Sequence, residues 1–358
     1  MTAPAFHIAD PGDAKAIAEL LDTSTLPGWI TLSFRAAAGR HGPLHPGARI
    51  RTLIGPAGMA TRSVLPGFFN GQPAEIGYIG LLRIAPAFRH HPKLLRAACD
   101  QFRAQVHNAD ETPWYVASIL SDNTAAKRLL TANLPGLPKF TQINDYHTLA
   151  FRPKTARNTA DVRQATAQDI PALIDFINGQ NQSRPLAPRL TPGDFTTTAW
   201  PNLRPADFLI AQSNGQITGT IALWDQRPHH QIHVSAYAPP LGPLRGIVNA
   251  IAPLIGQPHL PAIGQTLGTA ALSFFTTAPD DGKTAVALIT AARHLAHARG
   301  LQLTTLGLCT DDPLLPILCK TLRHRRYDSC IYGVTWQDGE TLPDPKLFAG
   351  MKLDIGLL

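Results

Sequence analysis

The chain has 358 residues, 44% of them hydrophobic, and a formal net charge of +7 at pH 7. This length favours two domains over one, and the apolar fraction is enough to bury two ordinary cores. No apolar run approaches the roughly 18 residues of a membrane-spanning helix, and the first residues lack the basic and apolar stretches of a secretory signal. The four cysteines are scattered, which excludes a disulfide framework and predicts buried thiols. We therefore expect a cytoplasmic protein without a membrane partner.

The excess of basic residues permits acidic partners such as nucleic acid, anionic lipid or the phosphates of a cofactor. Nucleic-acid binders usually carry a dense basic stripe or a recognisable module, and the sequence has neither. A nucleic-acid partner is therefore not favoured. No set of three ligands with metal-binding spacing stands out, so no metal is expected. The oligomeric state is left open.

The two halves of the chain begin alike. Residues 6–9 predict a short strand, followed by a polar turn and a helical pattern from Ala14 to Leu21; residues 161–165 and Ile170 to Ile177 repeat this order. Asp and Thr residues in both turns are expected helix N-caps. Such likeness at a long period indicates an internal repeat. The polar stretch from Arg152 to Asn158 is expected to link the two units.

The likeness continues through a hairpin, a strand, a helix, a strand, a helix and a strand. The strongest hairpin signal is Asn214-Gly215, because a type I′ turn needs positive φ at both central residues. The corresponding segments, first unit then second, are the hairpins 49–65 and 208–224, the strands 76–84 and 268–276, the helices 93–106 and 284–299, the strands 114–119 and 303–308, the helices 124–131 and 313–322, and the last strands 140–151 and 329–336. This order predicts an α/β fold in which each unit is a twisted mixed sheet flanked by helices. Three long stretches rich in Pro and Gly, 27–46, 180–204 and 239–264, are expected to be loops.

The segment from Gly77 to Arg96 combines an aliphatic strand, a short turn and a helix start at Pro92. Proline suits the first helical position, and the free N–H groups and dipole of a helix start favour a phosphate. Positive side chains gather in the same place: Arg89, Lys93 and Arg96, with His90 and His91 able to add charge below neutral pH. The segment therefore predicts an anion site.

This segment resembles the acetyl-CoA segment of the GNAT N-acetyltransferase superfamily, which has an aliphatic strand, a Pro-containing turn and an Arg-x-x-Gly-x-Gly/Ala loop at a helix start. Residues 121–130 resemble that family's Asn-x-x-Ala helix, and residues 136–140 its Gly-Phe turn. The resemblance implies two tandem GNAT-like domains: residues 1–152, which would hold acetyl-CoA or another acyl-CoA, and residues 159–358, which would be degenerate. It also implies the residues that bind the cofactor: Leu82, Arg83 and Ile84 on the pantetheine strand, Arg89, His90, His91, Lys93 and Leu94 in the phosphate loop, and Asn123 beside the pantetheine arm.

The sequence departs from the family's pattern at three positions. Pro92 and Leu94 stand where the family has small residues that let the backbone approach the pyrophosphate closely. Leu130 stands where many members have a Tyr that protonates the leaving thiolate. In the second unit, Asp280 and Asp281 occupy the equivalent turn, where carboxylates would repel a phosphate. Asp281 is better explained as a helix N-cap, and we expect no working cofactor site there.

Acyl transfer to an amine needs a base that takes a proton from the nucleophile. The candidate catalytic residues are Glu75, His90 and Tyr146, and a strand N–H such as that of Leu82 or Ile84 is expected to bind the developing oxyanion. We therefore predict an enzyme, an N-acyltransferase that moves an acetyl or other acyl group from CoA to a small amine-type acceptor. Two alternatives stay open: a non-catalytic sensor or scaffold that binds acyl-CoA or another ligand, and an aminoacyl-tRNA-dependent transferase.

Overall fold

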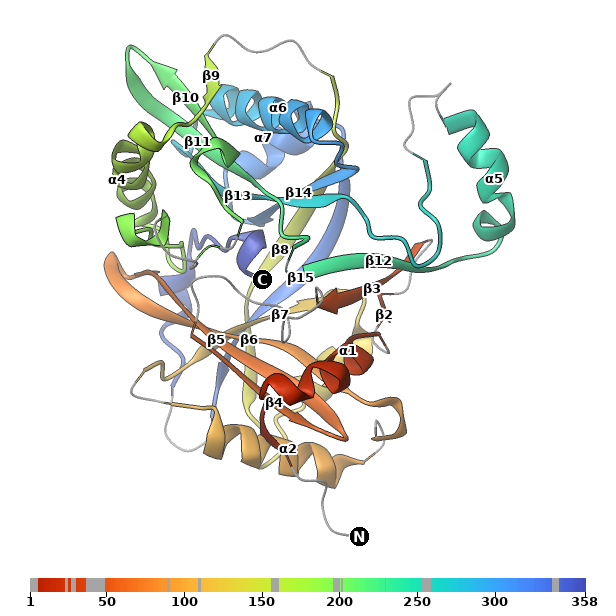
Figure 1. The fold of residues 1–358 in the computed structure, drawn as a ribbon. Coiled ribbons are helices and arrows are strands. Elements are labelled where there is room, and N and C mark those ends of the chain that lie inside the picture. The colour runs from red at the N-terminus through yellow and green to blue at the C-terminus, as the bar shows by residue number, and fades with distance from the viewer. Residues whose placement is uncertain are drawn as a thin grey trace.

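One long mixed β-sheet runs through the molecule, with helices on both of its faces (Figure 1). The computed structural model describes residues 6–22, 25–26, 30–36, 49–88, 91–108, 111–155, 161–195, 200, 202–228, 230–252, 259–336 and 341–358. Twelve described strands make up this sheet, in the order β1-β4-β5-β6-β7-β15-β8-β14-β13-β11-β10-β9. The pairs β6/β7 and β13/β14 are parallel, and the other neighbours are antiparallel. The mixed α/β fold predicted from the sequence is confirmed.

The first half contains the predicted elements in the predicted order, with two further strands between its first helix and its hairpin. Its strands are β1 (His7–Ile8), β2 (Thr25–Leu26), β3 (Ile30–Ala36), β4 (Arg49–Gly55), β5 (Gly58–Phe69), β6 (Gln72–Ile84), β7 (Tyr115–Leu120) and β8 (Lys139–Phe151). Its helices are α1 (Ala14–Asp22), α2 (Pro92–Gln105) and α3 (Thr124–Leu130). Pro92 is the first residue of α2, as its fixed φ favours.

The second half has the same order of predicted elements, but β2 and β3 have no counterpart in it, and a strand and a helix stand between its hairpin and its next strand. Its strands are β9 (Val162–Gln164), β10 (Phe208–Ser213), β11 (Gln216–Trp224), β12 (His230–Tyr237), β13 (Thr269–Thr277), β14 (Leu303–Cys309) and β15 (Arg325–Thr335). Its helices are α4 (Ile170–Asn181), α5 (Leu241–Ile251), α6 (Gly282–Ala298) and α7 (Leu314–Thr321). Asn214 and Gly215 both have positive φ in the β10–β11 turn, which confirms the predicted hairpin.

The two halves are joined by backbone pairing because each adds its last strand to the other. Strand β15, the last of the second half, lies between β7 and β8 of the first half, and β8 in turn pairs with β14. Tyr332 on β15 faces Ala117 on β7, and Leu306 on β14 faces Leu149 on β8. The sheet is therefore continuous across the molecule.

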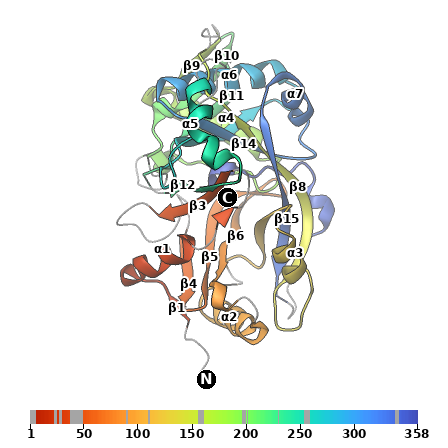
Figure 2. The ribbon, with the colours of Figure 1, turned by 90° about the vertical axis from the view of Figure 1, so that its right-hand side faces the viewer.

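Apolar side chains alternate between the two faces of the sheet, as strand geometry requires. In the first half, Ile54 packs with α1 on one face, whereas Leu53 packs with Phe102 of α2 on the other. Figure 2 shows α1 and α2 on opposite sides of the strands. In the second half, α4 covers one face around Trp224, and α6 and α7 cover the other around Leu272.

A smaller sheet of β12, β3 and β2 extends beside the main one and carries α5 as an arm (Figure 1). Residues 30–36 and 241–251 were expected to be loops, and this prediction is wrong for both segments. Strand β3 depends on pairing with β12, which lies about 200 positions away in the sequence. Helix α5 keeps an apolar repeat at Leu244, Ile247, Val248 and Ile251 despite its glycines and proline. No helix within the described residues has the length and apolar character that a membrane crossing needs.

Candidate functional site

The neighbouring parallel strands β6 and β7 diverge soon after they meet. They pair only at Gly77 with Tyr115 and at Tyr78 with Val116, although β6 continues to Ile84. At Leu81 the backbone takes φ 51°, and the pairing of β6 with β5 shifts at the same place. A bulky residue with positive φ inside a strand marks a bulge, and such strain often lies at functional sites. The bulge leaves a gap between the two strands.

Buried tyrosines fill one side of this gap. The ring of Tyr78 packs over Gly80, where an added Cβ would lie 2.7 Å from Cε1 of the ring. The backbone N–H of Ser118 on β7 donates to the Tyr78 hydroxyl, and burial raises the pKa of Tyr78 to about 12. The Tyr146 hydroxyl donates to the carbonyl of Leu353 at 3.0 Å, and burial raises its pKa well above the ordinary value. Tyr146, a predicted catalytic residue, therefore lies in the interior.

A cavity of about 270 Å³ opens on the α2 side of the gap. Strand β6 contributes Ile79, Leu82, Arg83 and Ile84, and helix α3 contributes Leu129 and Leu130. The wall formed by the α2 region consists of His91, Leu94, Leu95, Ala98, Cys99 and Phe102. Leu53, Phe140 and Trp336 lie at its base, and all three are buried. This cavity lies between β6, α2 and α3, the strand and the two helices that the sequence predicts to hold a cofactor.

The N-terminus of α2 borders the cavity and keeps its backbone donors uncapped by a side chain. His91 is the N-cap residue, and its side chain makes no capping hydrogen bond. Lys93 is exposed in the first turn. Arg96 reaches the loop before β8, where a Cβ on Gly136 would lie 2.7 Å from its Nε. Positive charge and the positive end of the helix dipole therefore lie at the edge of the cavity, an arrangement that suits a phosphate.

Most of the residues predicted to bind a cofactor are brought together. Leu82, Arg83, Ile84, His91 and Leu94 all line the cavity. Asn123 is instead the N-cap of α3, where its Oδ1 accepts from the N–H of Ala126 at 3.1 Å. Arg89 and His90 lie outside the described residues.

Arg83 is the strongest charge on the cavity wall. Its Nη1 donates to the carbonyl of Leu82 at 3.1 Å, and its buried Nε has no hydrogen-bond partner. Burial lowers the pKa of Arg83, and the neighbouring Tyr78 partly offsets this effect. Among the described residues, no carboxylate forms an ion pair with Arg83. A guanidinium in this state is ready to bind an anionic or strongly polar group.

Glu75 lies at the other end of β6, six residues before the bulge and so roughly 20 Å from it along an extended strand. Its Oε2 accepts from Nη2 of Arg49 at 2.9 Å. Arg49 and Arg62 also bind Glu111. Burial would raise the pKa of Glu111, but hydrogen bonds from these two arginines outweigh it and lower that pKa. Glu75 thus belongs to a charged network and does not line the cavity.

The equivalent strand of the second half, β13, has the same bulge but is covered by the chain itself. Phe274 has φ 51°, like Leu81, and the pairing of β13 with β11 shifts there too. The Asp354 carboxylate accepts the backbone N–H groups of Phe274 at 2.5 Å and of Gly356 at 2.9 Å. Gly356 packs so closely that an added Cβ would lie 2.3 Å from Oγ of Ser273. Asp281 caps α6 by accepting from the N–H of Thr284, as predicted.

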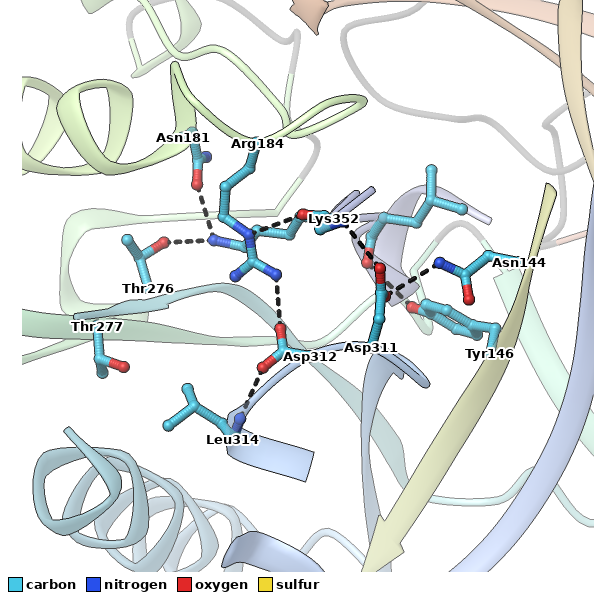
Figure 3. Close-up of polar contacts among 12 residues, drawn as sticks. Asn144, Tyr146, Asn181, Arg184, Thr276, Thr277, Asp311, Asp312, Leu314 and Lys352 are labelled. Atoms are coloured by element: carbon cyan, nitrogen blue, oxygen red, sulfur yellow. Dashed lines mark hydrogen bonds and ion pairs between the residues drawn. The ribbon is translucent and has the colours of Figure 1, made fainter. Parts of the chain in front are cut away.

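A buried polar cluster lies beside this covered strand, between α4, β13, β14 and the C-terminal segment (Figure 3). Lys352 Nζ donates to Oδ1 of Asn181 at 2.8 Å and to Oγ1 of Thr276 at 2.9 Å. Burial is the main cause that lowers the pKa of Lys352 to about 7, and the positive charge of Arg184 adds to it. Arg184 in turn donates to Oδ2 of Asp312 at 2.7 Å. This cluster could not be predicted from local sequence patterns, because its members come from four distant segments.

Neither the cysteines nor a metal site offers catalytic groups among the described residues. Burial raises the pKa of both Cys99 and Cys309 to about 12, so both thiols are neutral near pH 7. Within the described residues, no group of three or more His, Cys, Asp or Glu is placed to hold a metal ion.

Comparisons with known proteins place this geometry in a known fold. No protein-family model matches the chain, and no curated protein matches its sequence. Several solved structures match in fold. An N-myristoyltransferase from Saccharomyces cerevisiae with bound myristoyl-CoA matches with a TM-score of 0.60 at 11% identity, over 98% of this chain and 89% of that one. A GCN5-related N-acetyltransferase from Sphaerobacter thermophilus matches with a TM-score of 0.51 at 16% identity, over 93% and 96% of the two chains.

A GCN5-related glucosamine N-acetyltransferase region of a fungal β-N-acetylglucosaminidase also matches, with a TM-score of 0.53 over 92% of this chain. At 10% identity, this match again concerns the course of the chain and not its residues. The chain therefore has the GNAT fold.

Proposed function

We propose that the chain is an acyl-CoA-dependent N-acyltransferase whose chemistry takes place in its first half. The observation that carries the proposal is the gap between β6 and β7, with a cavity that ends at the uncapped start of α2. Leu82, Arg83 and Ile84 line this cavity where the backbone of β6 has left β7. The fold shared with acyltransferases supports the same conclusion.

The described residues fit a CoA thioester at this place. The unpaired edge of β6 offers backbone groups to the pantetheine amides, and the start of α2 with Lys93 offers the helix dipole and a positive charge to the phosphates. The bound thioester supplies an activated acyl group. The N–H groups of β6 at the bulge would stabilise negative charge on its carbonyl oxygen. An amine acceptor must lose a proton as it attacks, and the predicted His90 is the candidate group for that role.

We propose that the second half binds no cofactor and instead supports the site. In the first half the start of the second helix is uncapped by a side chain, whereas in the second half Asp281 already occupies the equivalent position. The bulge of β13 is bound by Asp354, so its N–H group is not available to a thioester. The division into tandem domains at 1–152 and 159–358 is part of this proposal. The exchange of last strands means that these units are not separate in space.

A second candidate function is binding of acyl-CoA without transfer. The observation in its favour is Leu130, which lines the cavity where many GNAT members have a proton-donating Tyr. Release of free CoA thiol separates the two functions. We expect the protein, given an acyl-CoA and a pool of small amines, to release thiol faster than the same mixture without an amine. Tight binding of acyl-CoA without any amine-dependent thiol release would favour the sensor instead.

A further inference from the structure

We propose that the cavity beneath α2 holds a hydrocarbon chain, so that the acyl group is of medium length, about eight to ten carbons, and not acetyl. This inference rests on the proposed function, because it concerns the same cofactor. It is carried by the size of the cavity, by the chemistry of its wall and by the small residues on α2.

The wall of the cavity is almost wholly apolar. Of its side chains, only Arg83, His91 and the indole N–H of Trp336 are polar, Met59 and Cys99 carry sulfur, and the others are hydrocarbon. Arg83 and His91 lie at the β6 and helix-start side, whereas the buried side chains of Leu53, Phe140 and Trp336 close the base. Cavities with such apolar walls exclude water and bind apolar molecules. The base therefore suits a hydrocarbon and not a polar group.

The pantetheine arm alone does not account for this space. Its two amides need hydrogen-bond partners, which the open edge of β6 offers. Beneath α2 the backbone is that of a helix and of paired strands, whose N–H and C=O groups already bond to one another. From Leu95 to Phe102 this helical wall is about 11 Å long. An alkyl chain needs no such partners, so it fits where the pantetheine does not.

The size of the cavity sets the length of the chain. Small side chains, Ala98 and Cys99, lie in the middle of the helical wall between Leu94 and Phe102 and leave room there. An apolar cavity of roughly 150 Å³ holds benzene, with its six carbons. By the same ratio, 270 Å³ holds roughly eleven carbons, and the part beside β6 is shared with the pantetheine arm. An acetyl group would leave most of this space empty.

The test is a series of calorimetric titrations with CoA, acetyl-CoA, butyryl-CoA, octanoyl-CoA and decanoyl-CoA. Each buried methylene is expected to tighten binding by about fourfold, so octanoyl-CoA should bind at least 100-fold more tightly than acetyl-CoA. Ala98→Phe fills the cavity and should remove this gain while the affinity for acetyl-CoA stays within about threefold. Ala104→Phe is the matched control, because Ala104 lies on the same helix but is exposed. It should keep the wild-type dependence on chain length.

Thermal unfolding would check that each variant is folded. If Ala98→Phe does not fold, Cys99→Phe fills the same cavity from the neighbouring position on α2 and carries the same expectation. Binding of CoA and acetyl-CoA with no gain for longer chains would overturn the inference and leave the proposed function standing. An equal gain in Ala98→Phe and wild type would also overturn it, because the chain would then lie elsewhere. No binding of any CoA compound would overturn both.

Discussion

Lys352 is a cation enclosed in the interior, held by Asn181 and Thr276 (Figure 3). Its pKa is about 7 in the folded protein and about 10.4 in an unfolded chain. Between these values the unfolded chain binds the proton more tightly, so folding is favoured as the pH rises. Below pH 7 the folded protein bears the whole cost of burying the charge. The lysine therefore links stability to pH in the direction opposite to a paired surface lysine.

We expect the free energy of unfolding to rise between pH 7 and 8.5 by up to about 1.4 kcal/mol per pH unit from this one group. Lys352→Met keeps the length of the side chain and removes the charge, so the slope should disappear. Urea unfolding at several pH values gives the free energy of unfolding of the wild type and the variant. The two proteins contain the same thiols and tyrosines, so a difference in slope comes from Lys352. An identical slope in the variant would mean that Lys352 does not carry the effect.

Tyr146 has two possible roles, structural and catalytic, and one substitution separates them. Its buried hydroxyl donates to the Leu353 carbonyl, and its ring lies against Gly307, where an added Cβ would meet the hydroxyl at 1.7 Å. Because Tyr146→Phe leaves that buried carbonyl without its donor, we expect a loss of about 1–3 kcal/mol in stability. We expect acyl transfer to fall less than tenfold, since the raised pKa keeps the hydroxyl protonated. A loss of 100-fold or more at unchanged stability would instead make Tyr146 the catalytic acid or base.

At the scale of elements, local signals in the sequence predicted most of the structure. The capping boxes of Asp10 with Asp13 and of Thr166 with Asp169, the Asn214-Gly215 turn and the cap at Asp281 all involve residues close in sequence. Their hydrogen bonds are decided within a few positions, so the residue types are sufficient. The same holds for β6 and α2, which follow one another along the chain, whereas the cavity between them also needs Leu53 and Trp336 from distant segments.

Features that depend on distant segments could not be predicted. Strand β3 pairs with β12, and Asp354 binds the bulge of β13 from about 80 positions away. No local pattern distinguishes a carboxylate that will cap a distant strand from one that will face solvent. Helix α5 could not be predicted for another reason. Its glycines and Pro243 lower the helix propensity, although its apolar repeat fits a helix.

At the scale of the whole molecule, the exchange of last strands joins the two halves into one sheet. Strand β15 pairs with both β7 and β8, so the core of the first half contains Ile331 and Val334 from the second. Removing this strand from either half would expose the edges of its neighbours. The repeat in the sequence indicates two units, but it carries no signal that each unit lends a strand to the other.

We therefore expect one cooperative unfolding transition and not two. Near-ultraviolet circular dichroism and Trp fluorescence follow different aromatic groups, among them Trp114 in the first half and Trp200 and Trp224 in the second. Their urea midpoints should coincide, and the calorimetric and van't Hoff enthalpies should agree. Ile331→Ala should move all probes together, by about 2–5 kcal/mol. Separate midpoints, with only one of them shifted by Ile331→Ala, would show that the halves unfold independently.

The most direct test of the proposed cofactor site is a calorimetric titration of octanoyl-CoA into the wild type, Lys93→Glu and Lys15→Glu. Both lysines are exposed, one in the first turn of α2 and the other on α1. Reversing the charge beside bound phosphates should weaken binding about 10- to 30-fold, whereas Lys15→Glu should bind like the wild type. This result would place the phosphates at the start of α2. No binding to the wild type, or equal binding by all three proteins, would contradict a CoA site there.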